Sequence, residues 1–124
     1  MIKYTIDPAA KIICVRASVD LIGNDLRETI VELQRDPNYD PAFDLLADIS
    51  AVSFFSLARN TKGELREFAT ARPGVRRAFV VGQSFFAREF AKLYRLVLGD
   101  APEKFGIFGN VDEARSWLAA EAAK

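Results

Sequence analysis

The sequence predicts an α/β fold, a five-stranded and mostly parallel sheet in the order β-β-α-β-α-β-α-β-α. Two observations predict it. Short β-branched or apolar runs alternate with segments in which apolar residues recur at helical spacing. The connections between them are short, and the apolar residues, which make up half of the composition, are spread over the whole length of the chain. We therefore expect one domain over residues 1–124, with right-handed crossovers between the parallel strands.

The chain begins with a predicted hairpin. Residues 1–6 alternate weakly, residues 7–8 (Asp-Pro) are a turn signal, and residues 11–19 form a β-branched run. So short a connection permits only antiparallel pairing. A helix then opens at residues 23–25 and ends before Pro37. Its apolar stripe consists of Leu26, Ile30 and Leu33.

The middle of the chain continues the alternation. Residues 43–49 are almost continuously apolar, as expected for a strand that is covered on both faces. Residues 61–64 (Thr-Lys-Gly-Glu) have the spacing of a capping box, and the helix that they open stops at residues 73–74 (Pro-Gly). Residues 75–81 are the fourth predicted strand.

The last third of the chain adds two helices and a strand. Ser84 is a plausible cap for a helix that residues 99–102 (Gly-Asp-Ala-Pro) end. Residues 104–108 form a short fifth strand, and Asn110 caps a final helix with Glu113 at the capping-box position. The inward stripes are Phe86, Phe90, Leu93 and Val97 in the first helix, and Val111, Ala114, Trp117 and Leu118 in the second.

Composition excludes several classes of function. Seventeen basic residues equal seventeen acidic ones, which argues against nucleic acid as the main partner. The chain has no histidine, so a Ser-His-acid triad is ruled out, and with one cysteine a structural zinc site is not expected. We expect no metal and no cofactor. The single Cys14 lies in an apolar run and is expected to be a small buried hydrophobe.

The same features predict the compartment. One cysteine cannot form an intramolecular disulfide, which indicates a reducing environment. No apolar run approaches the ~20 residues of a membrane span, and no secretory signal pattern is present at the start. We therefore expect a cytoplasmic protein without a membrane span.

The strand over residues 43–49 ends in polar residues, at the sheet edge where α/β proteins normally bind ligands. Asp48 is either a base or hydrogen-bond anchor, or a cap for neighbouring loop amides, and the cap is favoured. The turn at residues 82–84 (Gly-Gln-Ser) is either a phosphate cradle or an ordinary helix cap, and again the cap is favoured.

Two surface features leave alternatives open. Basic residues dominate one segment and continue into the next helix, where they make either an anion-attracting face or a solvated helix surface. They are Arg59, Lys62, Arg66, Arg72, Arg76, Arg77, Arg88, Lys92 and Arg95. Aromatic residues widen the apolar stripe of the helix after residue 84, and two more follow the third strand. They are Phe54, Phe55, Phe85, Phe86, Phe90 and Tyr94. Core packing is the favoured interpretation, and an interface or an apolar pocket is the alternative.

The chain resembles the STAS-like (SpoIIAA-like) proteins in its element order and in three segments. These segments are the loop over residues 36–41, the strand end Leu46-Ala47-Asp48-Ile49-Ser50 and the closing residues 108–118. These are small bacterial proteins that share the fold of anti-sigma-factor antagonists and, more distantly, of CRAL-TRIO lipid-binding domains. The resemblance covers nearly the whole chain. It implies a regulatory scaffold, but Leu57 stands where antagonists carry the phosphoacceptor serine. A one-residue slip would place Ser56 there.

The sequence therefore predicts a non-enzymatic STAS-like domain without catalytic residues. The first hypothesis is a regulatory or protein-interaction module, with self-association as a homodimer among its forms. The alternative is a carrier or sensor of a small apolar or amphipathic ligand, lipid-like and anionic. The residues predicted to contact the ligand or partner are Ser53, Phe54, Phe55, Ser56, Arg59, Phe86 and Phe90.

Overall fold

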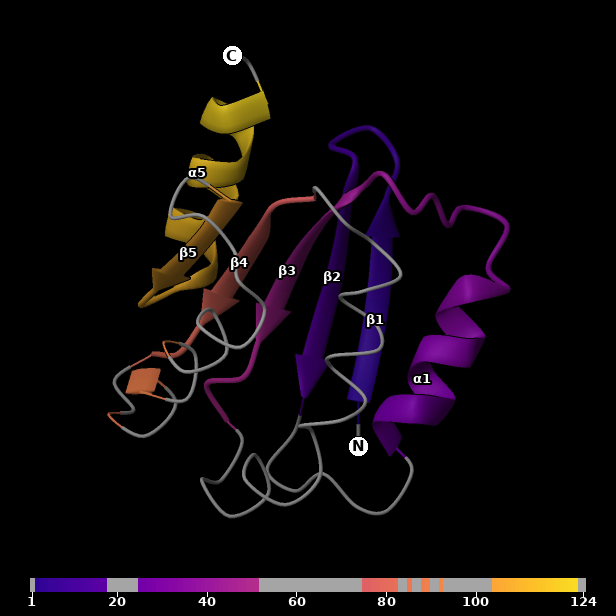
Figure 1. Cartoon of the computed structure of the whole chain (residues 1–124), viewed down its shortest axis with the longest axis horizontal. Helices are drawn as coiled ribbons and strands as arrows, with labels where there is room; N and C mark the ends of the chain where they lie inside the picture. Colours follow the sequence, from indigo (N-terminus) through magenta and orange to yellow (C-terminus); the bar gives the residue numbers. More distant parts are fainter. Residues whose placement is uncertain are drawn as a thin grey trace.

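In the computed structural model, the described residues are 2–17, 25–51, 75–82, 85, 88, 89, 92 and 104–122. They form an α/β fold whose five strands make one sheet, with a helix at either side of it (Figure 1). The elements are β1 (Ile2–Asp7), β2 (Ile12–Ala17), α1 (Asp25–Gln34), β3 (Asp44–Asp48), β4 (Arg77–Val80), β5 (Phe105–Phe108) and α5 (Val111–Ala122).

The sheet is mixed, and its strands lie side by side in chain order. β1 and β2 form the expected antiparallel hairpin, with Tyr4 opposite Val15. The pairs β2–β3, β3–β4 and β4–β5 are parallel. The carboxyl ends of β2 to β5 therefore meet at one edge, the lower edge in Figure 1.

Side chains alternate between the two faces of the sheet, and each face packs against one described helix. On the first face, Ile13 and Leu45 form a buried cluster with Leu33 of α1. The same face continues over β4 and β5 with Phe79 and Phe105, whose ring centroids are 5.0 Å apart. The expectation that the third strand is covered on both faces is thus confirmed for Leu45 and Leu46, which are both buried.

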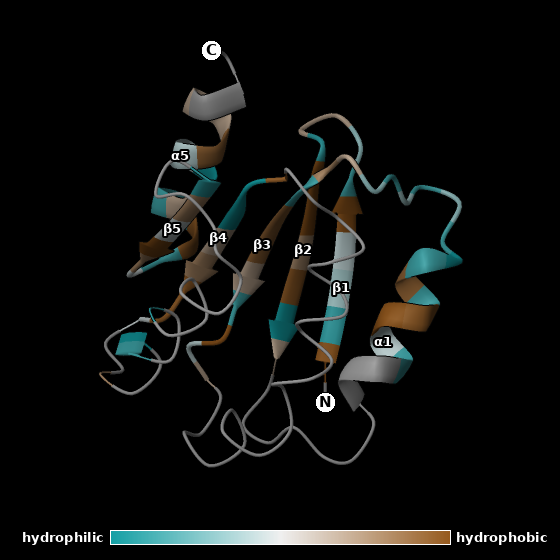
Figure 2. Ribbon diagram, in the orientation of Figure 1, coloured by the Kyte–Doolittle hydropathy of each residue, from teal (hydrophilic) through white to brown (hydrophobic). Residues whose placement is uncertain are grey.

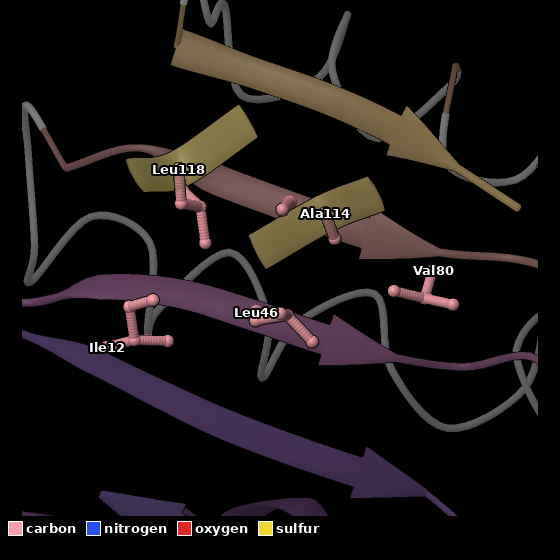
Figure 3. Packing of buried hydrophobic residues seen from close by; sticks show 6 residues of the cluster. Ile12, Leu46, Val80, Ala114 and Leu118 are labelled. Atoms are coloured by element: carbon pink, nitrogen blue, oxygen red, sulfur yellow. The ribbon is translucent and has the colours of Figure 1, made fainter. Parts of the chain in front are cut away.

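The second face packs against α5 through a buried cluster (Figure 3). Ala114 and Leu118 project from the helix toward Leu46 of β3 and Val80 of β4. Ala114 and Leu118 are 0% and 1% exposed, so the predicted inward stripe of the last helix is confirmed. At the outer side of this cluster the ring of Phe108 lies 5.5 Å from that of Trp117, centroid to centroid.

Local sequence signals explain the boundaries of these elements. The N–H of Glu113 donates to Oδ1 of Asn110 over 2.9 Å, which confirms Asn110 as the cap of α5. In the hairpin turn, the N–H of Ala10 donates to Oδ1 of Asp7 over 3.1 Å. Lys11 completes that turn with a φ of 59°, a left-handed conformation that L-residues adopt at an energetic cost.

Part of the predicted element order falls on residues that are not described. The helix expected over residues 61–72 lies wholly outside the described residues. Of the helix expected after Ser84, only residues 85, 88, 89 and 92 are described, and these are helical. None of the described helices is long and apolar enough to cross a membrane.

Candidate functional site

The residues predicted to contact a ligand or partner fall outside the part of the chain that the structure describes. These are Ser53, Phe54, Phe55, Ser56, Arg59, Phe86 and Phe90, together with the turn residues Gln83 and Ser84. Their roles remain predictions. The neighbouring Phe85 is described, and 66% of its surface is exposed. Phe85 therefore does not lie in the core, the place that the sequence favoured for this aromatic group.

Asp48 ends β3 as a turn cap. Its Oδ1 accepts the N–H of Ser50 over 3.0 Å and the hydroxyl of the same residue over 2.6 Å. Next to this turn lies Gly82, whose φ of 60° favours glycine, and a Cβ placed on it would come within 3.2 Å of the Ser50 Cβ. The favoured interpretation of Asp48 as a cap is confirmed. The same residue also lines the pocket that is described next.

A pocket of about 260 Å³ opens on the face of the sheet that carries α5. It lies beside the helix, over β1, β2 and the carboxyl end of β3. Its walls are formed by Lys3, Tyr4, Thr5, Cys14, Val15, Arg16, Leu46, Asp48, Val111 and Arg115. Every one of these residues is described, and three strands and the first two turns of α5 contribute to the site.

The strand register explains why these residues meet. Lys3 pairs with Arg16 across the hairpin, and Arg16 pairs with Asp48, so three charged residues lie in one row across β1, β2 and β3. The next row on the same face is Thr5, Cys14 and Leu46. Figure 2 adds a difference across the strands: the middle of β1 is pale or hydrophilic, whereas the middle of β3 is hydrophobic. The pocket therefore has a charged end at the carboxyl edge and a less polar floor.

Arg115 reaches from α5 across the sheet to the hairpin. Its Nη2 donates to the Sγ of Cys14 over 3.3 Å, and its Nη1 lies 3.8 Å from Oδ2 of Asp7. Burial raises the pKa of the Cys14 thiol, although the Arg115 charge opposes this shift. Cys14 is half-buried, packs against the cluster under α5 and also lines the pocket, so the expectation of a small buried hydrophobe holds in part. At neutral pH its side chain is a protonated thiol.

Of the basic residues predicted to form a charged face, Arg59, Lys62, Arg66, Arg72 and Arg95 lie outside the described residues, and the structure places only the others. Arg76 is tied to Asp44, with its backbone N–H 3.0 Å from Oδ1 and its Nη2 3.2 Å from Oδ2. Arg77 is buried, and Lys92 lies 3.3 Å from the carboxylate of Glu89. The positive charge that the structure gathers around a pocket instead comes from Lys3, Arg16 and Arg115. Sequence reasoning missed these three, although the hairpin pattern places Lys3 and Arg16 close together.

The chemistry available in this pocket is recognition by charge and apolar contact. Guanidinium groups bind carboxylates and phosphates with paired N–H donors. Among the described residues, no group of three or more His, Cys, Asp or Glu side chains is arranged to hold a metal ion. Half-buried Val111 offers apolar surface beside the cations, above the buried Leu46. An amphipathic anion fits this combination.

Comparison with protein-family models, curated proteins and solved structures found no match to this chain. The likeness to STAS-like proteins thus depends on the sequence pattern alone, and the function has to be argued from the pocket.

Proposed function

We propose that this protein is a non-enzymatic regulatory domain that binds a small amphipathic, anionic ligand between the β1–β2 hairpin and α5. The observation that supports it is the 260 Å³ pocket, where three cationic side chains surround apolar surface. Ligand sites commonly combine apolar walls with a few converging polar groups. The ligand class is the one expected from the sequence, but its binding site is this pocket and not the group of phenylalanines predicted from the sequence.

The regulatory part of the proposal follows from Asp48. This residue lines the pocket and also holds the turn at Ser50, immediately before the segment predicted to contact a partner. A ligand that attracts or displaces the cations near Asp48 would alter the hydrogen bonds of that turn. Ligand binding would thereby be transmitted to residues 53–59, the predicted interaction edge.

We also propose the domain type, element order, compartment and partners that the sequence predicts. These comprise a single STAS-like domain, the full β-β-α-β-α-β-α-β-α order and a bacterial cytoplasmic protein with a protein partner or a second copy of itself. The exposed Phe85, on the helix predicted to form part of that interaction surface, favours the partner.

Cys14 allows a direct test, because it is the chain's single cysteine and lines the pocket. We expect phenylacetate, a small amphipathic anion, to slow alkylation of Cys14 by iodoacetamide at pH 8, measured by intact mass. Occlusion of the thiol and neutralisation of Arg115 act in the same direction, because Arg115 lowers the thiol pKa.

The matched variant is Thr5→Phe, which places a ring in the pocket from an exposed position. Protection by phenylacetate should be lost in Thr5→Phe and retained in Arg35→Gln, where an exposed cation outside the pocket is removed. Alkylation rates that do not respond to saturating phenylacetate in the parent protein would refute the ligand-binding function.

A further inference from the structure

We infer that the ligand of this pocket is a dianion, a small molecule that combines two negative charges with a compact apolar part. This inference rests on the proposed function and narrows it. Two ligand types share this chemistry, a phosphate monoester and a dicarboxylate. The charge that lines the pocket, the weak contact that holds Arg115 and the size of the space all favour such a ligand.

The charge of the pocket exceeds what a single anion neutralises. Among the lining residues, Lys3, Arg16 and Arg115 contribute three positive charges and Asp48 one negative charge, which leaves a net charge of +2. Asp7 lies outside the lining and forms only the weak ion pair with Arg115 that is described below. The whole chain has a net charge of zero. A hollow with one dominant sign of charge concentrates ligands of the opposite sign. A dianion matches this excess and a monoanion leaves half of it uncompensated.

The single negative charge of the pocket is already engaged. Oδ1 of Asp48 accepts two hydrogen bonds from Ser50, one of them only 2.6 Å long. Arg16 lies beside Asp48 in the register, with Lys3 on its other side. Two cations therefore face one carboxylate in this row, and a ligand oxygen between Lys3 and Arg16 would meet a net positive charge.

Arg115 supplies the second contact for an anion. Its partner Asp7 is 3.8 Å away, and both side chains are more than 40% exposed, so this ion pair is weak. The thiol of Cys14 is also a poor acceptor. An anionic ligand oxygen would therefore replace Asp7 at Arg115 with little opposition. The guanidinium of Arg115 lies at Cys14, and the other cations, Lys3 and Arg16, lie two residues further along β2. The two positive ends of the pocket are therefore separated by roughly 7 Å along the strand.

The size of the pocket limits the rest of the ligand. Its 260 Å³ equal the volume of about nine liquid water molecules. Half-buried Val111 borders this space and provides apolar contact, and the buried Leu46 closes its floor. The apolar part is therefore about as large as one phenyl ring, and a long acyl chain would not be enclosed.

Isothermal titration calorimetry of the full chain at pH 7.5 and 0.15 M salt tests this charge rule. Four probes share a phenyl ring: phenylacetamide is neutral, phenylacetate is a monoanion, and phenyl phosphate and phenylsuccinate carry close to two charges. We expect at least one dianion to bind tenfold or more tightly than phenylacetate. Tighter phenyl phosphate indicates a single compact anion site, and tighter phenylsuccinate indicates that both cationic ends are used.

Asp7→Asn sharpens the test because it should increase affinity. The variant keeps an oxygen for the Ala10 N–H and removes the charge that competes for Arg115. We expect the preferred dianion to bind about two- to fivefold more tightly. Asp40→Asn is the matched control, because Asp40 caps the Ala42 N–H in the same way and is not part of the pocket. Arg16→Gln should weaken the dianion at least fivefold.

The outcomes separate the two proposals. Equal affinities for phenylacetate and both dianions, or an Asp7→Asn affinity equal to that of Asp40→Asn, would overturn the dianion inference and leave the ligand-binding function intact. Failure of all four probes to bind would overturn both.

Discussion

The face of the sheet that carries α5 has two halves, and the difference between them explains the site. Over β3, β4 and β5 the face is apolar and closed by Ala114, Trp117 and Leu118. Ile12, at the start of β2, belongs to the same covered cluster. Over β1 and the rest of β2 the face carries Lys3, Thr5, Cys14 and Arg16, and the pocket opens there with Asp48 of β3 at its border. Five strands at a spacing of ~4.8 Å span about 19 Å, whereas a helix with its side chains is about 10 Å wide. Among the described helices, α5 therefore covers about half of this face and leaves a wall for a ligand at its side.

The comparison assigns stability to the covered half and recognition to the open half. Buried apolar contacts stabilise a fold strongly, whereas exposed charges contribute little. Substitutions in the covered half should therefore lower the free energy of unfolding, and substitutions in the open half should change ligand affinity. A substitution at the boundary between the halves should change both quantities.

The largest expected effect is in the covered half. Leu118→Ala removes a fully buried side chain from the cluster with Leu46 and Val80. We expect the free energy of unfolding to fall by about 2–5 kcal/mol, measured by urea denaturation. Thr5→Phe, in the open half, should change it by less than about 0.5 kcal/mol. Similar losses from both substitutions would contradict the division.

A smaller effect is expected where the two halves join. Asn110 caps α5, and the first turns of that helix place Val111 and Arg115 at the pocket. Asn110→Ala should reduce the free energy of unfolding by about 1 kcal/mol and also weaken binding of the preferred dianion. Asn110→Asp keeps the capping oxygen and should retain stability. An Asn110→Ala variant with unchanged affinity would show that the position of α5 does not shape the pocket.

The smallest effect concerns pH. Because the folded-state pKa of Cys14 is raised, the stability contributed by its protonated form is fully present below the unfolded thiol pKa of about 8.5 and is lost as pH rises toward the folded value. The free energy of unfolding should therefore decrease between pH 7.5 and 9.5, and less so in Cys14→Ser. This range lies below the ionisation of Tyr4, whose pKa is also raised by burial and by its hydrogen bond to Asp36. Parallel pH profiles of the two proteins would contradict the assignment.

Local patterns were sufficient to predict much of this fold. The hairpin, the Asn110 cap and the buried stripe of Ala114 and Leu118 depend on residues close in sequence, and the structure confirms all three. The strand boundaries differ from the predicted ones by a few residues at most, as for β4, which is Arg77–Val80 against a prediction of 75–81. The α/β class and the number of strands follow from the same alternation.

The pocket could not be predicted in the same way, because it depends on contacts between distant segments. Arg115 and Cys14 are 101 residues apart, and they meet only because α5 returns over β3. Of the charge run over residues 59–77, the structure describes only the end, where Arg76 pairs with Asp44 and Arg77 is buried. The positions of Lys3 and Arg16 could have been predicted to lie opposite each other, but only by assigning the exact register of the hairpin.

The central claim is that the open half of this sheet face binds the ligand, and amide chemical-shift mapping tests it most directly. On titration of the ¹⁵N-labelled protein with phenyl phosphate or phenylsuccinate, the account predicts the largest shifts at Thr5, Cys14, Arg16, Asp48 and Arg115. The amides of β5 and of Leu118 should change little. Shifts concentrated at β5 and Leu118, or no shifts at saturating ligand, would contradict the account.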